Sequence, residues 1–344
     1  MAFVVVAVLV FFAGRYSADP SSTPVVDSSQ PAIVAASVRL GAGIHPRGLF
    51  VEPDDGVTPL TTAIHNSQHS IWIEMYELTN KSIIHALEYA HANGVDVRVI
   101  LEPHPYGSGS INQSAYDNLM AADIPVHWAS SRFALTHQKS MVVDGASAYV
   151  MTTNFTRSAF RANREFDVVD ASPPDVAAVS AIFTADWNDR PYAPAALDPN
   201  LPLSPVDARP LLTALIASAQ RTLDVYGEEM QDAGLIAALT ASAERGVKVR
   251  VILPAPKAGA TDYSGAGVAT LRSTGVQVVR LSSLYIHAKV IIADSARAFV
   301  GSQNISASSL DRNRELGVIV ADRVAIATLT TTFAGDWVSG GNAP

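Results

Sequence analysis

The chain has 344 residues and is 48% hydrophobic, so it is long enough for two compact units that each bury a core. Its formal net charge of -8 argues against a globally basic surface for nucleic acid, although a local basic groove is compatible with it. The absence of cysteine excludes disulfides, thiolate nucleophiles and cysteine metal sites, and it leaves the compartment undetermined.

The N-terminus begins with an uncharged apolar run, AFVVVAVLVFFAG at 2–14, followed by Arg15 and a Ser/Pro-rich stretch. A run of 13 residues suits the core of a signal peptide better than a transmembrane helix, which needs about 20. We therefore predict a signal peptide or membrane anchor over 1–18 and a linker over 19–44. The protein would be secreted, periplasmic or tethered to the membrane, and a buried N-terminal segment is the alternative.

Beyond residue 45, β-branched runs alternate with helical patterns, which is typical of α/β layered domains. The first half predicts a strand, a helix and a strand, and the second half repeats this order. A proline-rich stretch at 190–205 breaks the periodicity, so we expect one domain over 45–196 and another over 197–344. The predicted elements are strands at 70–78 and 95–103 around a helix at 81–93, then strands at 222–229 and 247–256 around a helix at 235–245.

Two segments repeat one spacing of polar residues at an offset of 150. The segment from Thr136 reads THQKSMVVDGASAYVMTTNFT, and the segment from Tyr285 reads YIHAKVIIADSARAFVGSQNIS. Downstream, NREF and FTADW in the first half match NREL and FAGDW in the second. The chain is therefore an internal duplication. The matched residues are His137, Lys139, Asp144 and Asn154 in the first half, and His287, Lys289, Asp294 and Asn304 in the second.

The spacing inside each motif separates two kinds of residue. His137 and Lys139 are two residues apart, so on a strand both side chains project from one face. Asp144 precedes Gly145 at a predicted hairpin turn, so we interpret it and Asp294 as structural. Acidic residues at 74, 77, 228 and 229 are interpreted as strand-end residues in solvated loops, with reach to a cleft mouth as the lesser alternative.

The duplicated HxKxxxxD pattern, each with a following Asn and an Asn-Arg-Glu, resembles the phospholipase D superfamily from about Gly48 to Trp337. The resemblance implies two tandem α/β domains with mixed β-sheets flanked by helices. It also implies a pseudo-twofold relation between the domains and an active site at their interface. One departure is visible, since the first half has Met151-Thr152 where the second has Gly301-Ser302.

Phosphodiester cleavage requires a nucleophile, an acid for the leaving oxygen and positive charge around the phosphoryl oxygens. By the resemblance, His137 is the nucleophile that forms a phosphohistidine, and His287 protonates the leaving oxygen. Glu165 and Glu315, which follow the histidines at equal intervals, would hold the distal imidazole nitrogens. The remaining predicted site residues are Lys139, Lys289, Asn154 and Asn304 around the phosphate, and the hydroxyls of Thr152 and Ser302 as substrate contacts. We expect neither a metal nor another cofactor.

The leading interpretation is a phospholipase D-like phosphodiesterase that cleaves a phospholipid by hydrolysis or transfer to an alcohol. An exported metal-independent endonuclease is one alternative, in which arginines near the motifs would track a phosphate backbone. A cardiolipin synthase-like phosphatidyltransferase is another, although one short apolar segment matches a multi-span anchor poorly. Intact motifs disfavour a noncatalytic binding module. The expected partners are phospholipid and a membrane surface, with nucleic acid as the alternative, and the expected state is a monomer. The arginines in question are Arg157, Arg161, Arg164, Arg312 and Arg314.

Overall fold

The computed structural model describes residues 39–194, 196–256 and 259–341, which belong to one compact unit. The predicted signal peptide or anchor over 1–18, and most of the predicted linker over 19–44, lie outside the described residues. Within the described part, no helix combines the length and apolarity needed to cross a membrane.

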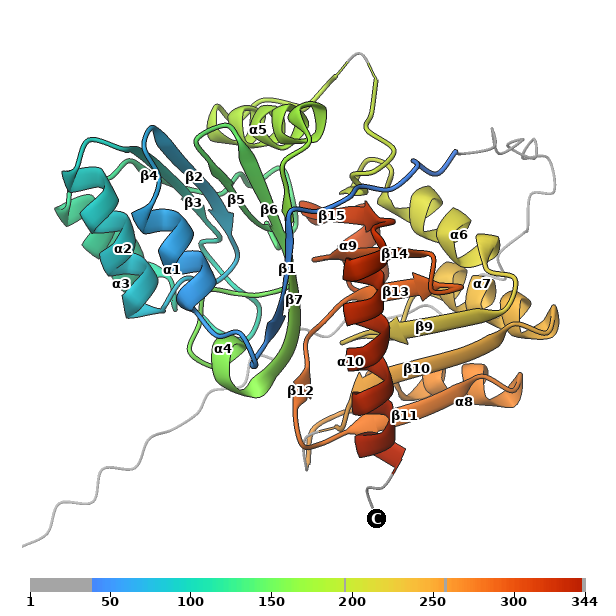
Figure 1. The fold of residues 1–344 in the computed structure, drawn as a ribbon. Coiled ribbons are helices and arrows are strands. Elements are labelled where there is room, and N and C mark those ends of the chain that lie inside the picture. Colours follow the sequence, from blue (N-terminus) through green and yellow to red (C-terminus); the bar gives the residue numbers. More distant parts are fainter. Residues whose placement is uncertain (1–38, 195, 257–258, 342–344) are drawn as a thin grey trace, which may run out of the picture. The chain divides into compact units, whose positions relative to one another are not determined.

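The first half forms a mixed sheet with strand order β1-β7-β6-β5-β2-β3-β4 (Figure 1). Strands β2, β3 and β4 are parallel, and β5, β6, β7 and β1 continue the sheet in antiparallel pairs. The predicted strand, helix and strand are confirmed as β2, α2 and β3. The elements are β1 (Gly48–Glu52), α1 (Thr58–His65), β2 (Ser70–Met75), α2 (Lys81–Ala92), β3 (Asp96–Leu101), α3 (Gln113–Ala121), β4 (Val126–Trp128), β5 (Lys139–Val143), β6 (Ser147–Met151), α4 (Ala159–Ala162), β7 (Asn163–Asp170) and α5 (Pro173–Trp187).

The second half repeats this topology in the strand order β11-β10-β9-β13-β14-β15-β8. Here β9, β10 and β11 are parallel, and the other neighbours are antiparallel. The expected fold of two tandem α/β domains is therefore confirmed. The elements are β8 (Leu203–Ser204), α6 (Ala208–Ser218), β9 (Thr222–Tyr226), α7 (Ala233–Glu244), β10 (Lys248–Pro254), α8 (Gly265–Ser273), β11 (Gln277–Leu281), β12 (Tyr285–Ile286), β13 (Val290–Ala293), β14 (Arg297–Gly301), α9 (Ala307–Asp311), β15 (Glu315–Val320) and α10 (Arg323–Gly341).

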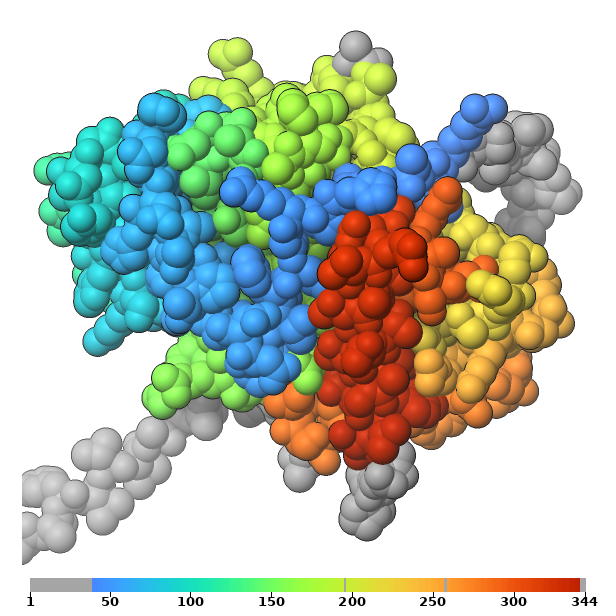
Figure 2. Space-filling model, viewed as in Figure 1, coloured from blue at the N-terminus to red at the C-terminus, as the bar shows by residue number. Residues whose placement is uncertain are grey.

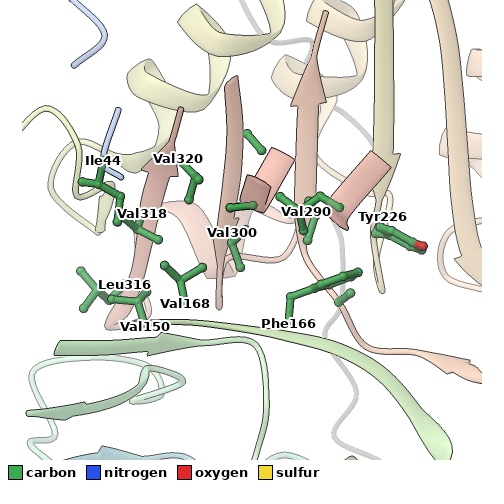
Figure 3. Close-up of a cluster of buried hydrophobic side chains, with 14 of the residues drawn as sticks. Ile44, Val150, Phe166, Val168, Tyr226, Val290, Val300, Leu316, Val318 and Val320 are labelled. Carbon is green, nitrogen blue, oxygen red and sulfur yellow. The ribbon is translucent and has the colours of Figure 1, made fainter. Parts of the chain in front are cut away.

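Three buried apolar clusters arrange these elements in layers. One cluster lies between α1, α2, α3 and the first sheet, and its counterpart lies between α6, α7, α8 and the second sheet. The third joins the two sheets, and Figure 3 shows Phe166 and Val168 of β7 facing Val300 of β14 and Leu316 of β15. Because the shared cluster excludes water from the junction of the halves, apolar burial holds the two motif-bearing sheets together.

A tryptophan-bearing helix covers each sheet beside this junction. In α10, Phe333 and Trp337 stack with ring centroids 5.9 Å apart, and the guanidinium of Arg250 lies over both rings. In α5, Phe183 and Trp187 stack in the same way at 5.6 Å, with Arg98 over Trp187. Figure 2 shows the outer side of α10 at the molecular surface. The repeated FxxDW segments therefore dock the last helix of each half.

The hairpin turns of the motifs have the geometry that their sequences predict. Asp144 and Gly145 have φ values of 56° and 58°, as expected for a tight hairpin that favours Asp and Gly. The Asp144 carboxylate accepts hydrogen bonds from three backbone N–H groups at the start of β2, and Asp294 does the same at the start of β9. Both aspartates thus tie the motif hairpin to the neighbouring strand.

Candidate active site

The backbone brings the two motifs together by crossing between the halves. Strand β12, which precedes His287, pairs in parallel with the start of β7 in the first half. Symmetrically, Thr136 bridges to Arg314, and the His137 N–H donates to the Arg314 carbonyl at 2.9 Å. Each His-Lys segment is therefore hydrogen-bonded to the Asn-Arg-Glu segment of the other half.

The histidine and glutamate side chains follow the same exchange. His137 Nδ1 lies 2.8 Å from Glu315 Oε2, and His287 Nδ1 lies 2.7 Å from Glu165 Oε1. Each glutamate thus contacts the histidine of the other half rather than the histidine that it follows in sequence. Both glutamates are fully buried, so the two imidazole rings are held with Nε2 directed away from the pairing carboxylate.

The two hydroxyls that were predicted to contact substrate form hydrogen bonds within the protein interior instead. Thr152 Oγ1 donates to Glu165 Oε2 at 2.7 Å and accepts from the Phe166 N–H at 2.9 Å. Ser302 Oγ donates to the Leu316 carbonyl at 3.3 Å and accepts from its N–H at 3.1 Å. Neither side chain is exposed, so the prediction of direct substrate contacts is corrected: these hydroxyls brace the strands that carry the glutamates.

The lysines and asparagines of the motifs lie beside the imidazoles. Lys139 Nζ donates to the His137 carbonyl at 2.5 Å, and Lys289 Nζ donates to the His287 carbonyl at 2.6 Å. Asn154 and Asn304 each follow a buried strand and direct Nδ2 toward a glutamate, at 3.5 Å and 3.4 Å. The four side chains carry amine and amide N–H donors of the kind that can stabilise a phosphoryl group.

Burial lowers the pKa of both titratable side chains of the first His-Lys pair. Burial lowers the pKa of His137 to about 4, more than offsetting the opposing influence of Glu315. Burial and the nearby Lys289 also lower the pKa of Lys139 to about 7. His137 is therefore neutral at pH 7, donates from Nδ1 to Glu315, and keeps a lone pair on Nε2.

The two halves differ at the end of the strand beside each motif. The Tyr76 ring lies edge-on to the His137 ring with centroids 4.5 Å apart, and Lys139 Nζ lies 4.6 Å from the Tyr76 centroid. In the second half, Glu228 Oε2 lies 2.8 Å from Lys289 Nζ and 3.5 Å from His287 Nε2. Glu228 is thus part of the site, and its interpretation as a solvated loop residue is wrong.

The interpretation of Glu74 as a solvated loop residue is also wrong, because it lies within β2 and its side chain is buried. It is 1% exposed, accepts a hydrogen bond from Gln138 at 3.3 Å, and has a pKa raised by burial.

The sequence does contain a signal that Glu228 belongs to the site. The matched strands VDVRVIL and VKVRVIL are offset by 152 residues, and this offset aligns Glu228 with Tyr76.

Two of the arginines considered as phosphate contacts form buried ion pairs across the halves. Arg164 contacts Asp336 of α10 at 2.8 Å, and Arg314 contacts Asp186 of α5 at 2.8 Å. They are 6% and 2% exposed, so they cannot track a phosphate backbone. Arg157, Arg161 and Arg312 are exposed. The Arg of each Asn-Arg-Glu therefore holds the partner helix while the Glu holds the partner histidine.

The site therefore brings together a neutral imidazole, a second imidazole, two lysine amines and two amides. Among the residues that the structure describes, no group of three or more His, Asp or Glu is arranged to hold a metal ion. These side chains meet where β12 pairs with β7 and Thr136 bridges to Arg314, and groups of these kinds can supply the nucleophile, the proton donor and the anion-stabilising donors that phosphodiester chemistry needs.

Such a duplicated site between two mixed sheets defines an enzyme of the phospholipase D superfamily, as the sequence motifs predict. The family model described as "Cardiolipin synthase, PLD-like domain" matches residues 60–187 and 212–337. The chain belongs to this family, and each matched segment carries one His-Lys motif.

Individual relatives sharpen the comparison. The chain is 26% identical over 268 residues to cardiolipin synthase A of Pseudomonas aeruginosa, covering 67% of this chain and 54% of that protein. It is 22% identical over 335 residues to cardiolipin synthase 1 of Staphylococcus aureus, covering 83% and 66%. The chain thus spans about half the length of the Pseudomonas relative. These relatives favour the transferase alternative over the hydrolytic interpretation.

Solved structures share the fold at lower identity. Phosphatidylserine synthase of Haemophilus influenzae superposes with a TM-score of 0.66 at 12% identity, covering 87% of each chain. A polyphosphate kinase of Porphyromonas gingivalis gives a TM-score of 0.66 at 18% identity, covering 83% of this chain and 46% of the kinase. The paired-domain architecture is therefore shared by a phosphatidylserine synthase and a polyphosphate kinase.

Proposed function

We propose that this chain transfers a phosphatidyl group from a phospholipid to an alcohol acceptor, with water as a competing acceptor. The observation that carries the proposal is that the neutral His137 and His287 are each held at Nδ1 by a different buried glutamate, Glu315 and Glu165. The cardiolipin synthase relatives support transfer as the main outcome. A signal or anchor, proposed from the sequence alone, would bring the site to a membrane surface.

In the first step, His137 Nε2 attacks phosphorus and forms a P–N bond. The P–O bond to the departing alcohol breaks, and the proton on His287 Nε2 passes to that oxygen. Glu315 stabilises the positive charge that develops on His137 through the Nδ1 contact of 2.8 Å. In this proposal, Lys139 and Asn154 donate to the phosphoryl oxygens during this step.

In the second step, the acceptor alcohol gives its proton to His287 and its oxygen attacks phosphorus. The P–N bond breaks, which releases neutral His137 and the new phosphodiester. The donor and acceptor bonds are both phosphodiester bonds, so the exchange requires no external energy source. Water in place of the alcohol would give hydrolysis by the same route.

The charges around the site support a lipid over a polynucleotide. Glu77, Glu228 and Glu229 are partly exposed near the motifs, where they would repel a long phosphate backbone. Two of the five arginines that could have bound such a backbone are internal. Carboxylates instead accept hydrogen bonds from the hydroxyls of a glycerol-type acceptor.

The test incubates the purified chain with phosphatidylglycerol vesicles, with and without ethanol, and in parallel with single-stranded and duplex DNA. We expect a lipid product carrying two phosphatidyl groups, diverted to phosphatidylethanol by the added alcohol, and activity that survives exhaustive chelation. Phosphatidic acid as the sole product, even with ethanol, would return hydrolysis to first place. DNA cleavage without lipid turnover would contradict the lipid assignment.

A further inference from the structure

The second half carries a carboxylate at a position where the first half carries a phenol. Leu78 bridges to Phe155 at the end of β2, and Met230 bridges to Ile305 at the end of β9. Counting back two residues from each bridge gives Tyr76 and Glu228 as structural equivalents. The duplicated site is therefore unequal at a residue that touches both motif side chains.

Glu228 is bound by the donors of its own motif. Its Oε2 accepts from Lys289 Nζ at 2.8 Å and Asn304 Nδ2 at 3.4 Å, and it lies 3.5 Å from His287 Nε2. Its Oε1 accepts from the Tyr285 hydroxyl at 2.9 Å. Burial alone would raise the pKa of Glu228, but Lys289 and His287 hold it well below its usual range. Glu228 therefore acts as a permanent anion at neutral pH.

Carboxylates consequently face both nitrogens of the His287 ring. Glu165 lies at Nδ1 and Glu228 lies at Nε2, so both nitrogens meet acceptors. Only the doubly protonated imidazolium has a donor for each. His137 Nδ1 contacts the Glu315 carboxylate, and its ring packs against the Tyr76 ring with centroids 4.5 Å apart.

The shell behind Glu165 adds further acidic groups that the other half lacks. Glu52 pairs in register with Glu165, and Asp167 follows it on the same strand. At the corresponding places beside Glu315 lie Ser204 and Gly317. A Cβ on Gly317 would lie 2.1 Å from the Phe299 ring, so that half has no room for a carboxyl there.

We propose that Glu228 is a positioning residue that keeps the proton on His287 and thereby assigns the acid role to the second half of the site. This inference rests on the proposed function, and it gives a physical reason why His287 acts as the acid while His137 acts as the nucleophile. The titratable groups around His287 and its two carboxylates are Glu165, Glu52 and Asp167 from the first sheet, Glu228 and Glu229 after β9, Tyr285 from β12, Lys289 just before β13, and His137 and Lys139 of the first motif. Burial raises the pKa of Glu52 and of Asp167 to about 8, so both are largely protonated at pH 7, and Glu228 is the fixed anion beside the His287 ring.

The test compares Glu228→Gln and Glu228→Asp with wild type on two substrates over a range of pH. Phosphatidylglycerol has a leaving alcohol that needs a proton, whereas bis(4-nitrophenyl) phosphate has a leaving group that does not. Glu77→Gln is the matched control, because Glu77 accepts from Asn154 as Glu228 accepts from Asn304. Denaturant unfolding of every variant checks that each is folded.

We expect Glu228→Gln to lower turnover of phosphatidylglycerol by ~10–100-fold and to move the alkaline limb of its pH profile about one unit lower. The shift is downward because removing a fixed anion makes the imidazolium lose its proton more readily. Glu228→Asp should restore part of the shift, and Glu77→Gln should leave the limb where it is. Adduct formation from the nitrophenyl diester, followed by mass spectrometry, should stay within about threefold of wild type.

An unmoved alkaline limb in folded Glu228→Gln would overturn the inference, as would an equal shift in Glu77→Gln. Faster turnover in Glu228→Gln would also overturn it, since Glu228 would then be an anion competing with the phosphate. The nitrophenyl diester separates this test from the proposed function. A wild-type chain that cleaves it but transfers no lipid would refute the substrate and leave the role of Glu228 measurable.

Discussion

The two halves of the chain share strand order, turn geometry and motif spacing, yet their surroundings differ at three places around the imidazoles. Tyr76, Glu52 and Asp167 of the first half correspond to Glu228, Ser204 and Gly317 of the second. Because side chains are exchanged between halves, the extra carboxyls of both halves gather around His287. The comparison teaches that a duplication can conserve a scaffold while a few substitutions give its two copies different chemistry.

The largest expected effect separates the two histidines. His137→Ala and His287→Ala should each reduce lipid turnover by ~10⁴-fold or more, and the double variant should lose little beyond either one, since the residues act as a unit. With the nitrophenyl diester, His287→Ala should still form the covalent adduct and release it slowly, whereas His137→Ala should form none. Mass spectrometry that finds the phosphoryl group on His287 would reverse the assignment.

The next effect concerns the buried arginines that join the halves. Arg164→Met should lower the free energy of unfolding by ~3–5 kcal/mol, because it leaves Asp336 buried without its partner. Arg314→Met should cost somewhat less, since Arg164 also donates to Asp54 and to the Glu52 carbonyl. Urea unfolding measures both, with exposed Arg161→Met as the control. Equal, small losses in all three would mean that these pairs do not hold the interface.

Glu165 and Glu315, which each contact the histidine of the other half, allow the two halves to be compared directly. Glu165→Gln should act on His287 and slow proton transfer to the leaving oxygen, while Glu315→Gln should act on His137 and slow adduct formation, each by ~10²-fold. Single-turnover assays with the nitrophenyl diester distinguish the two, because its leaving group needs no proton. If Glu165→Gln instead blocked adduct formation, the exchange of side chains across the halves would be refuted.

The smallest effect tests the acidic shell directly. Burial, reinforced by Glu165, raises the pKa of Asp167 from its ordinary value near 3.8 to about 8. The folded state therefore holds a proton that the unfolded state releases, so the contribution of Asp167 to stability falls as pH rises between about 4 and 8. Asp167→Asn should gain stability over wild type across that window by at least ~1–2 kcal/mol and then keep a constant margin. Thermal unfolding at several pH values measures it, with the exposed Asp117→Asn as the control. A margin that does not change with pH would contradict the raised pKa.

Much of the architecture could be predicted from local pattern. The strands at the centre of each sheet, the helices between them and the Asp144 turn follow from periodicity, glycine and turn chemistry, which act over a few residues. The repeat at an offset of 150 identified both His-Lys pairs. Glu74 shows the limit, because a glutamate inside a strand can point either to solvent or inward, and only packing decides between them.

The duplication, the family of folds and the residue types suited to phosphoryl chemistry can all be read from the sequence, because repeated spacing and short-range pattern are properties of the chain. Three-dimensional packing was needed to establish which glutamate contacts which histidine, that Arg164 and Arg314 are buried, and that Glu228 lies next to His287. These contacts join residues separated by 59 to 178 positions in the chain, for example His137 and Glu315. Their partners depend on how the two sheets pack face to face, which spacing along one chain does not encode.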